Sequence, residues 1–354
     1  MRVVVVGAGI VGAAVAHEVA RAGADVVLLD AGPPASGVTA DSFAWIGEPR
    51  GSDPPDASTP LRRLALAEHR RLEAQVPGAR VRWRGCVTWG AQPFAADVPL
   101  GPGERLLDAG RLARLEPHLR VRPERSPHLV RDGAVDPVAL VRALARAARA
   151  RGARVLPRTA ATGLDVRGAR VTGVRTTAGT VPADAVVLAA GTGTRALCAP
   201  LGLDLPVAGS PALLVRLSAP PGLVGTLVAA PDLEVREAAA GLLLATAGEE
   251  GAGGDPRAAG EEVRRRVLDA FDVAPGAVRV LGARTGVRPV PADGLPLTGP
   301  VPGTAGLHVA VLHAALTLAP AVARLLAAEV VHGAEAAELV PLRPGRPVPA
   351  GWGG

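Results

Sequence analysis

The chain has 354 residues, of which 48% are apolar, so its length and composition predict one large domain or two interleaved domains with ample core. Its net charge of +6 depends on arginine alone, because the sequence contains no lysine, and it contains no tyrosine either. These absences exclude a lysine Schiff base and a tyrosine acid, base or clamp. Arg142, Arg146 and Arg149 lie opposite an apolar helix face, which indicates a solvated surface rather than a nucleic-acid partner.

Targeting and redox features point to an ordinary cytoplasmic protein. The first apolar strand begins two residues after Met1, which leaves no room for a signal peptide. The apolar stretch 316–331 is short and contains Arg324 and Glu329, so no membrane span is predicted. Cys86 and Cys198 lie far apart and predict neither a disulfide framework nor a metal site.

The N-terminus carries a nucleotide-binding pattern. The apolar strand 3–6 is followed at once by Gly7-x-Gly9-x-x-Gly12, and Asp30 ends the next apolar run. Gly7 permits a tight turn, Gly9 lets a pyrophosphate approach the backbone, and Gly12 lets the following helix pack on the strand. The helix N-terminus offers N–H groups to phosphate, and Asp30 offers a carboxylate to ribose hydroxyls. The pattern predicts an ADP-containing dinucleotide and leaves FAD and NAD open.

Periodicity and turn signals divide the rest of the chain into alternating elements. Asp136 is the expected N-cap of a helix with Pro137 at its first position. Short strands between 154 and 184 resemble a β-meander, and those between 213 and 246 an antiparallel sheet. The expected helices cover residues 10–22, 61–75, 112–119, 137–151, 260–270 and 316–331. The expected strands cover residues 3–6, 26–29, 81–89, 154–157, 160–167, 170–177, 181–184, 185–189, 213–217, 226–230, 233–236, 242–246 and 307–312.

Five segments together resemble the D-amino-acid oxidase-like flavoproteins, a group that includes glycine oxidase and monomeric sarcosine oxidase. The segments are GAGIVG with Asp30, RDGAVDP, DAVVLAAGTGT, GVRPVPADGLPLTGP and LHVAVLHAALTLAP, and the likeness lies in their order and spacing. The resemblance implies an α/β fold with an α+β cap. A doubly wound, Rossmann-like FAD-binding domain (1–48, 132–208 and 284–335) would be interleaved with an antiparallel-sheet substrate domain (49–131 and 209–283). Residues 336–354 are expected to form a loose tail.

The same resemblance implies non-covalent FAD and oxidation of a C–N bond. Hydride would pass from a small-molecule amine or amino acid to flavin N5, the imine would hydrolyse, and oxygen or another acceptor would take the electrons. The oligomeric state stays open. One alternative is a flavin-binding protein of this fold with slow turnover or a non-oxygen acceptor. An NAD-dependent dehydrogenase is another, although the late GVRP and LTLAP segments argue against it.

Site residues follow from the matching segments. Arg288 matches the arginine that receives a substrate carboxylate, His313 lies beside the expected flavin pyrimidine ring, and Trp45 is a candidate pocket wall. A surface arginine, a structural histidine and a core tryptophan are the respective alternatives. The expected FAD-binding residues are Gly7, Gly9, Ile10, Val11, Gly12, Asp30, Ala31, Thr39, Ala40, Asp41, Ser42, Phe43, Ala44, Ala161, Ala190, Gly191, Leu316 and Thr317.

Two departures from the family pattern bear on activity. Ala314 and Ala315 stand where family members usually have small residues, often glycine, and their methyl groups narrow the approach to the flavin. Sarcosine-oxidase relatives use a lysine near N5 to help oxygen react, and this chain has none. The second departure argues against rapid oxidase chemistry; the alternative is that His313 or an arginine supplies the positive charge instead.

Overall fold

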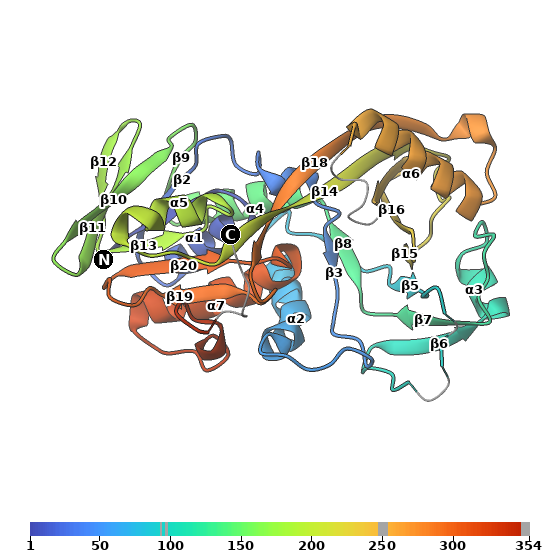
Figure 1. Cartoon of the computed structure of the whole chain (residues 1–354), viewed down its shortest axis with the longest axis horizontal. Helices are drawn as coiled ribbons and strands as arrows, with labels where there is room; N and C mark the ends of the chain where they lie inside the picture. Colours follow the sequence, from blue (N-terminus) through green and yellow to red (C-terminus); the bar gives the residue numbers. More distant parts are fainter. Residues whose placement is uncertain (93, 96–97, 247–253, 348–354) are drawn as a thin grey trace.

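The computed structural model describes residues 1–92, 94–95, 98–246 and 254–347. Two β-sheets lie at opposite ends of the molecule, and two long strands, β14 and β18, run between them (Figure 1). This arrangement matters for function because a large cavity lies where these two regions face each other.

The first region is built on a six-stranded sheet. All neighbouring strands are parallel except the β19/β20 pair, which is antiparallel. Its strand order is β19 (Leu297–Pro300), β20 (Leu307–Val311), β13 (Ala185–Leu188), β1 (Arg2–Val6), β2 (Asp25–Leu29) and β9 (Arg154–Leu156). The parallel strands are continuous apolar runs because both faces of the sheet are covered.

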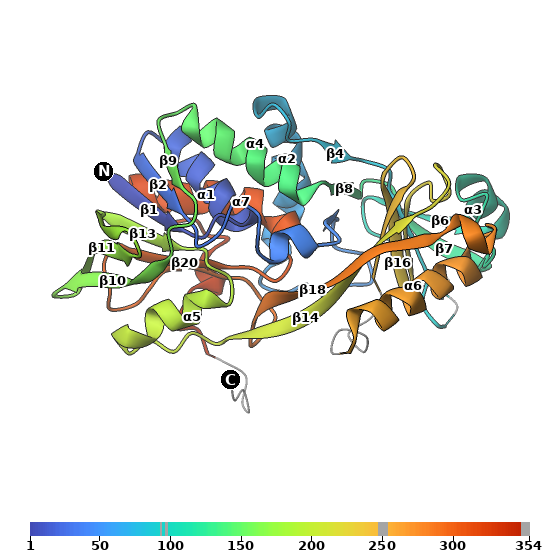
Figure 2. The same ribbon diagram turned by 90° about the horizontal axis from the view of Figure 1, so that it is seen from above.

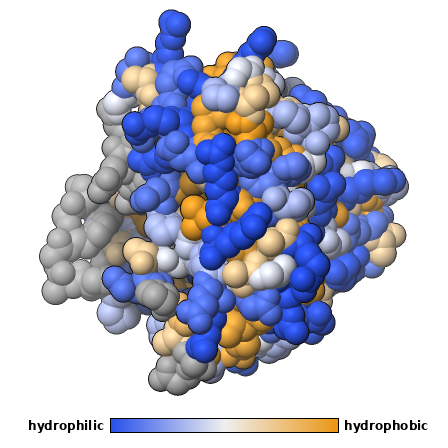
Figure 3. Space-filling model, turned by 90° about the vertical axis from the view of Figure 1, so that its right-hand side faces the viewer, coloured by the Kyte–Doolittle hydropathy of each residue, from blue (hydrophilic) through white to orange (hydrophobic). Residues whose placement is uncertain are grey.

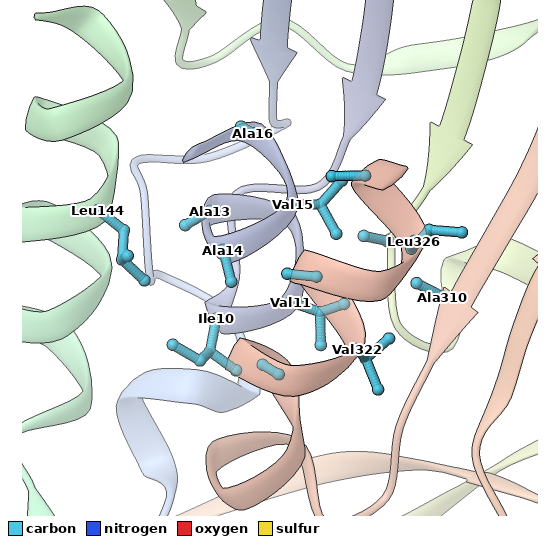
Figure 4. Close-up of a cluster of buried hydrophobic side chains, with 14 of the residues drawn as sticks. Ile10, Val11, Ala13, Ala14, Val15, Ala16, Leu144, Ala310, Val322 and Leu326 are labelled. Carbon is cyan, nitrogen blue, oxygen red and sulfur yellow. The ribbon is translucent and has the colours of Figure 1, made fainter. Parts of the chain in front are cut away.

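Helices cover one face of this sheet. Val3 and Val5 point toward α1 (Ile10–Arg21), α4 (Pro137–Arg149) and α7 (Ala315–His332), with which they share one core cluster. Helix α1 lies between α4 and α7, and its alanines let both neighbours approach closely (Figure 4). Helix α2 (Thr59–Gln75) packs on the outer side of α7.

A β-meander covers the other face, as Figure 2 shows from above. Val4 and Val6 alternate with Val3 and Val5 and contact a second core cluster. That cluster includes residues of the three-stranded sheet β10 (Ala161–Arg167), β11 (Arg170–Thr176) and β12 (Gly179–Pro182), and of the short helices α5 (Gly193–Cys198) and η2 (Ala199–Leu201). The predicted meander and the doubly wound arrangement are therefore confirmed.

The second region is an eight-stranded sheet, antiparallel except where β15 and β5 run parallel. Its order is β18 (Arg279–Pro291), β14 (Val207–Ser218), β17 (Leu242–Thr246), β16 (Leu233–Ala239), β15 (Leu227–Ala230), β5 (Cys86–Thr88), β7 (Arg125–Leu129) and β6 (Glu104–Asp108). Helix α6 (Pro256–Ala270) buries Val263 and Val267 against one face of this sheet. The opposite face turns toward the first region, which leaves room for a cavity.

Smaller elements complete the second region. A short sheet of β3 (Trp45–Ile46), β8 (Gly133–Val135) and β4 (Val81–Arg82) joins the two regions. Helix α3 (Ala109–Leu115) begins at Asp108, which accepts a hydrogen bond from Arg111 N. The outer end formed by α3, α6 and β6 is hydrophilic with separate apolar patches (Figure 3). Short 3₁₀ turns lie at η1 (Val38–Asp41), η4 (Pro275–Ala277) and η5 (Val340–Leu342).

Several predicted boundaries are wrong for identifiable reasons. The strand expected over 81–89 is two strands in different sheets, because Gly85 adopts φ = 73° between β4 and β5. Strand β14 is twelve residues long rather than five, and β3, β6, β7, β8, β18 and β19 were not among the expected strands. Helix α3 ends at Leu115, earlier than the predicted 119. The N-cap at Asp136 is confirmed, since its side chain accepts hydrogen bonds from Val138 N and Ala139 N.

The expectation of a loose tail is wrong for residues 336–347. Leu339 and Leu342 are fully buried in the helix-side core, so the tail contributes apolar area. Arg343 donates to both Glu329 carboxylate oxygens at 2.8 Å, and Arg346 pairs with Asp293 at 2.7 Å. Residues 348–354 lie outside the described part of the chain.

Helix α7 is the one helix among the described residues that is long and apolar enough to cross a membrane. Two-thirds of it is buried inside the protein, between α1 and α2. Its two charged residues are paired, Arg324 with Glu68 at 2.6 Å and Glu329 with Arg343 at 2.8 Å. This packing is that of a core helix.

Candidate active site

A cavity of about 1000 Å³ lies between the two regions. It extends from the glycine turn after β1 to the strands of the eight-stranded sheet, and the N-terminal end of α7 forms part of its wall. Its lining at the first end is mostly small residues together with Asp30, whereas Arg288 and Glu234 enter at the second end. The two ends are therefore different kinds of binding surface.

Two glycines of the N-terminal pattern make the first end. Gly7 has φ = 103°, and a Cβ there would lie 2.4 Å from Ala189 O. A Cβ on Gly12 would lie 1.7 Å from Gly7 O, so α1 can pack on the turn only without a side chain at this position. Gly9 lines the cavity at the start of α1, where backbone N–H groups have no intrahelical acceptor.

Asp30 lies at the end of β2 and faces the cavity. Its two carboxylate oxygens accept hydrogen bonds from Ala8 N at 2.6 Å and Gly32 N at 2.7 Å. These bonds fix the carboxylate, and each oxygen keeps a further lone pair for a ligand hydroxyl. The geometry fits the predicted ribose contact.

The segment after β2 brings a short turn, η1, beside α1. Thr39 Oγ1 accepts a hydrogen bond from Ile10 N at 3.2 Å, which satisfies one N–H of the first turn of α1. Asp41 is held from the opposite sheet by Arg284 at 3.2 Å and by Arg216 at 3.8 Å. Arg216 also donates to Ala40 O at 2.8 Å. These bonds attach the predicted flavin loop to both regions.

Helix α7 begins at the cavity and lacks one of its main-chain hydrogen bonds because its sequence contains a proline. Pro320 has no N–H, so Leu316 O lacks its usual helical donor. His69 of α2 supplies one, and its Nε2 donates to Leu316 O at 2.9 Å. Burial lowers the pKa of His69, which keeps the ring neutral. Leu316 and Thr317 line the cavity, so His69 supports this part of its wall.

Arg288 lies on β18 at the second end of the cavity. Ser210 is its partner in the β14/β18 register, and Arg288 Nη2 donates to Ser210 Oγ at 2.8 Å. This bond orients the guanidinium, whose planar group of five donors matches the geometry of a carboxylate. The position therefore favours the binding hypothesis for Arg288 over the surface alternative.

Trp45 lines the cavity and is held by a buried carboxylate. Its indole Nε1 donates to Asp132 at 2.7 Å, and its carbonyl oxygen accepts from Thr317 Oγ1 at 3.2 Å. Burial raises the pKa of Asp132 to about 7, although the bond from Trp45 acts in the opposite direction. The Arg50 guanidinium lies 5.8 Å from the centroid of the Trp45 ring. The ring is thus fixed in one orientation beside the cavity.

The predicted site residues converge, with two exceptions. Within the described part of the chain, Gly12 and Ala40 do not line the cavity: Gly12 packs under the turn, and Ala40 is bonded to Arg216. His313 lines the cavity and is exposed. The others that line it are Gly7, Gly9, Ile10, Val11, Asp30, Ala31, Thr39, Asp41, Ser42, Phe43, Ala44, Trp45, Ala161, Ala190, Gly191, Arg288, Leu316 and Thr317.

Sequence reasoning missed the acidic and hydroxyl side chains of the second end. Glu234 and Thr246 line the cavity, and Ser210 orients Arg288. The only signal was a polar residue at alternate positions of short strands, which usually indicates a solvated face. In this fold the other region covers that face. No group of three or more His, Cys, Asp or Glu residues that could hold a metal ion occurs among the described residues.

A dinucleotide fits the first end, because Gly9 has no side chain where it lines the cavity and the start of α1 opens into the cavity. A family model described as "FAD dependent oxidoreductase" matches residues 2–329 of the chain. The chain belongs to the FAD-dependent oxidoreductase family. This membership decides between the two dinucleotides, so the NAD alternative is wrong and the cofactor is FAD.

Known proteins are similar over nearly the whole chain. A D-amino acid dehydrogenase of Cereibacter sphaeroides is 31% identical over 92% of this chain and 91% of its own length. A glycine oxidase of Geobacillus kaustophilus is 28% identical over 88% of this chain and 87% of its own length. The crystal structure of glycine oxidase from that organism superposes with a TM-score of 0.85 at 25% identity, covering 98% of this chain and all of the other.

The family comparison agrees with the site. The chain is a flavin-dependent oxidoreductase of the D-amino-acid oxidase-like group, as its motifs predicted. Its FAD-binding residues would include Gly9 and Asp30 at the adenosine end and Leu316 and Thr317 near the other end. The division of the chain into domains at the predicted residue numbers stays a prediction. The strands β14 and β18 run across the predicted boundaries at 208/209 and 283/284.

Proposed function

We propose that the substrate is an α-amino acid whose carboxylate binds Arg288. The observation that carries the proposal is the placement of this guanidinium on the cavity wall, oriented by Ser210. A planar guanidinium binds a carboxylate with two parallel hydrogen bonds, which fixes both position and orientation. The names of the relatives support the class, since a D-amino acid dehydrogenase and glycine oxidases are among them.

The residues around Arg288 would orient this substrate. FAD, when bound, accepts a hydride from the substrate Cα. Trp45, held by Asp132, forms a rigid side of the space, and Ala314 and Ala315 narrow it at the start of α7. A fixed carboxylate and rigid walls hold the reacting carbon in one place, which is the main requirement of a hydride transfer.

We also infer that an acceptor other than dioxygen takes the electrons. The sequence contains no lysine to assist the reaction of oxygen, and a dehydrogenase is among the most similar relatives. A soluble dye should therefore support turnover at least about tenfold faster than air-saturated buffer, a difference of about 1.4 kcal/mol in barrier. Equal rates with dye and oxygen would contradict the inference.

The decisive experiment is anaerobic reduction of the FAD-loaded protein by amino acids, followed through the visible flavin absorbance. Arg288→Ala should lower kcat/KM by roughly 30-fold or more, since truncating one partner of a buried charge pair costs about 2–5 kcal/mol. Arg279→Ala, an exposed arginine of the same strand, is the matched control and should leave kcat/KM unchanged. Equal effects of the two substitutions would remove Arg288 from the site.

A further inference from the structure

Glu234 is a charged side chain on the cavity wall that the proposed function does not use. It lies on β16 between Leu233 and Val235, both of which are buried in the core against α6. Because neighbouring strand residues point to opposite faces, Glu234 faces the cavity. The face is the same one that carries Arg288.

The strand registers establish this shared face. Glu234 is paired with Thr246 on β17, and Val215 of β14 is paired with Ala245, so Thr246 lies beside Leu214. Ser210 lies four residues before Leu214 on the same strand and is paired with Arg288. An even number of residues along a strand preserves the face.

The same registers give the separation of the two charged residues. They are three strands apart, about 14 Å, and offset by four residues, about 13 Å, so their Cα atoms are about 19 Å apart. The charged ends are closer than the Cα atoms, because the Arg288 charge acts on the Glu234 carboxylate. Arg288 and Glu234 thus lie at separate points on one wall.

The surroundings of Glu234 leave its carboxylate short of partners. Among the described residues it forms no side-chain hydrogen bond and no ion pair, and the charges that act on it are those of Arg50 and Arg288. Burial nevertheless raises the pKa of Glu234 above the usual glutamate value. A buried carboxylate is stabilised when a cation enters its site.

We propose that Glu234 binds a cationic group at the end of the substrate side chain, so that the enzyme acts on amino acids with a terminal amine or guanidinium. The inference rests on the proposed function, since Arg288 must hold the carboxylate. The separation of the two backbone positions favours the side chain over the α-ammonium group. With a hydrogen bond of about 3 Å at each end, carboxylate and α-nitrogen span only about 9 Å, whereas a lysine-like side chain extends this to roughly 13 Å.

The first test compares lysine with norleucine, which has the same chain length without the ammonium group. Both enantiomers of each are used to reduce the FAD-loaded protein anaerobically. Wild-type kcat/KM should be roughly 10- to 100-fold higher for lysine, the effect of one charge-assisted hydrogen bond. Glu234→Gln should abolish this preference and change kcat/KM for norleucine less than about threefold. Glu124→Gln, an exposed glutamate, should preserve it.

Other results would overturn the proposal. If Glu234→Gln lowered kcat/KM equally for lysine and norleucine, Glu234 would be assigned to the α-amine that both substrates share. A wild-type preference for norleucine would show that the cation is not recognised. Reduction by neutral amino acids alone leaves the proposed function intact and removes this inference, whereas reduction by no amino acid removes the proposed function.

A binding measurement further separates the proposed function from the inference about Glu234. The ligands 6-aminohexanoate and hexanoate carry no α-amine, so they test the span between Arg288 and Glu234 without turnover. The amino compound should bind the wild type roughly tenfold or more tightly, measured as a perturbation of the flavin spectrum, and the difference should vanish in Glu234→Gln. Equal dissociation constants for the two ligands in the wild type would contradict the proposal.

Discussion

The two ends of the cavity recognise their ligands in different ways. At the adenosine end, the surface consists mainly of small residues and of backbone such as that of Gly7, where a side chain is impossible, together with the carboxylate of Asp30. At the substrate end, side chains such as Arg288 and Glu234 come from strands far apart in the sequence. Recognition by the backbone imposes a fixed glycine spacing within one segment, whereas recognition by side chains requires only that strands from different segments lie side by side. The adenosine end can therefore be predicted from the sequence, and the substrate end cannot.

The largest effect should come from an added side chain at the adenosine end. Gly12→Val places a Cβ 1.7 Å from Gly7 O, so helix α1 cannot pack on the turn. We expect loss of soluble, flavin-loaded protein, measured as the ratio of visible flavin absorbance to protein. Gly276→Ala is the control, because its Cβ would meet no heavy atom within 4 Å. A variant that retains a full flavin complement would show that the close packing is dispensable.

At the substrate end, the largest effect on stability should come from the buried carboxyl group of Asp132 rather than from a close contact. The pKa of Asp132 rises from 3.8 to about 7 on folding, so between these values the folded protein holds a proton that the unfolded chain lacks. Stability from this group is therefore greatest in acid and falls as pH rises to 7, by about 4 kcal/mol in all. Asp132→Asn cannot ionise and keeps an acceptor for Trp45.

Urea unfolding across pH 5–8 checks this expectation. The free energy of unfolding of Asp132→Asn, relative to that of the wild type, should increase as pH rises toward 7 and then level off. Asp132→Ala removes the acceptor of Trp45 Nε1 as well and should show a lower stability than the asparagine variant at every pH. A pH-independent difference between Asn and wild type would show that Asp132 does not titrate in this range.

A smaller effect is expected at the start of α7, where the two ends meet. His69→Leu leaves Leu316 O without a donor, because Pro320 has none to offer. The free energy of unfolding should fall by about 1–3 kcal/mol, the cost of a buried unsatisfied acceptor, and the protein should retain less flavin. His118→Ala, at an exposed position, serves as the comparison. Unchanged stability in His69→Leu would mean that another group satisfies this carbonyl.

The smallest expected effect tests a side chain at the backbone-built end. Thr39→Val keeps the shape of the residue and removes the acceptor for Ile10 N. Stability should fall by about 1 kcal/mol, as for loss of a helix cap, measured by thermal unfolding of the flavin-loaded protein. A loss of flavin binding as large as that of Gly12→Val would contradict the comparison of the two ends, since it would mean that a side chain recognises the cofactor at the adenosine end.

Sequence reasoning succeeded where local rules are strict. The glycine pattern, the Asp136 cap and the continuous valine strand each follow from one stretch of chain, and the structure has all three. Family resemblance extended this to Arg288, whose segment is distinctive. The strand β14 was predicted too short because Gly209 and Pro211 look like breaks.

Tertiary context explains that failure. Near Pro211, β14 is paired with β18 alone, since its pairing with β17 covers only residues 215–218. A proline is tolerated in such a two-stranded segment because the missing N–H faces no neighbour. Glu234 escaped notice for a related reason: its alternating position predicts a solvated face, and only the fold shows that the other region covers it. The packed tail around Leu342 likewise depends on a distant helix.

The β14/β18 ribbon limits how related chains can change length. Arg288 reaches the cavity only because its register with Ser210 is unbroken from residue 207 to residue 216. A single inserted residue in β18 would turn the guanidinium to the opposite face and present Val287 in its place. We therefore expect functional members with this site to differ by insertions in the loops that join these strands, while the strand segments that face the cavity keep a constant length.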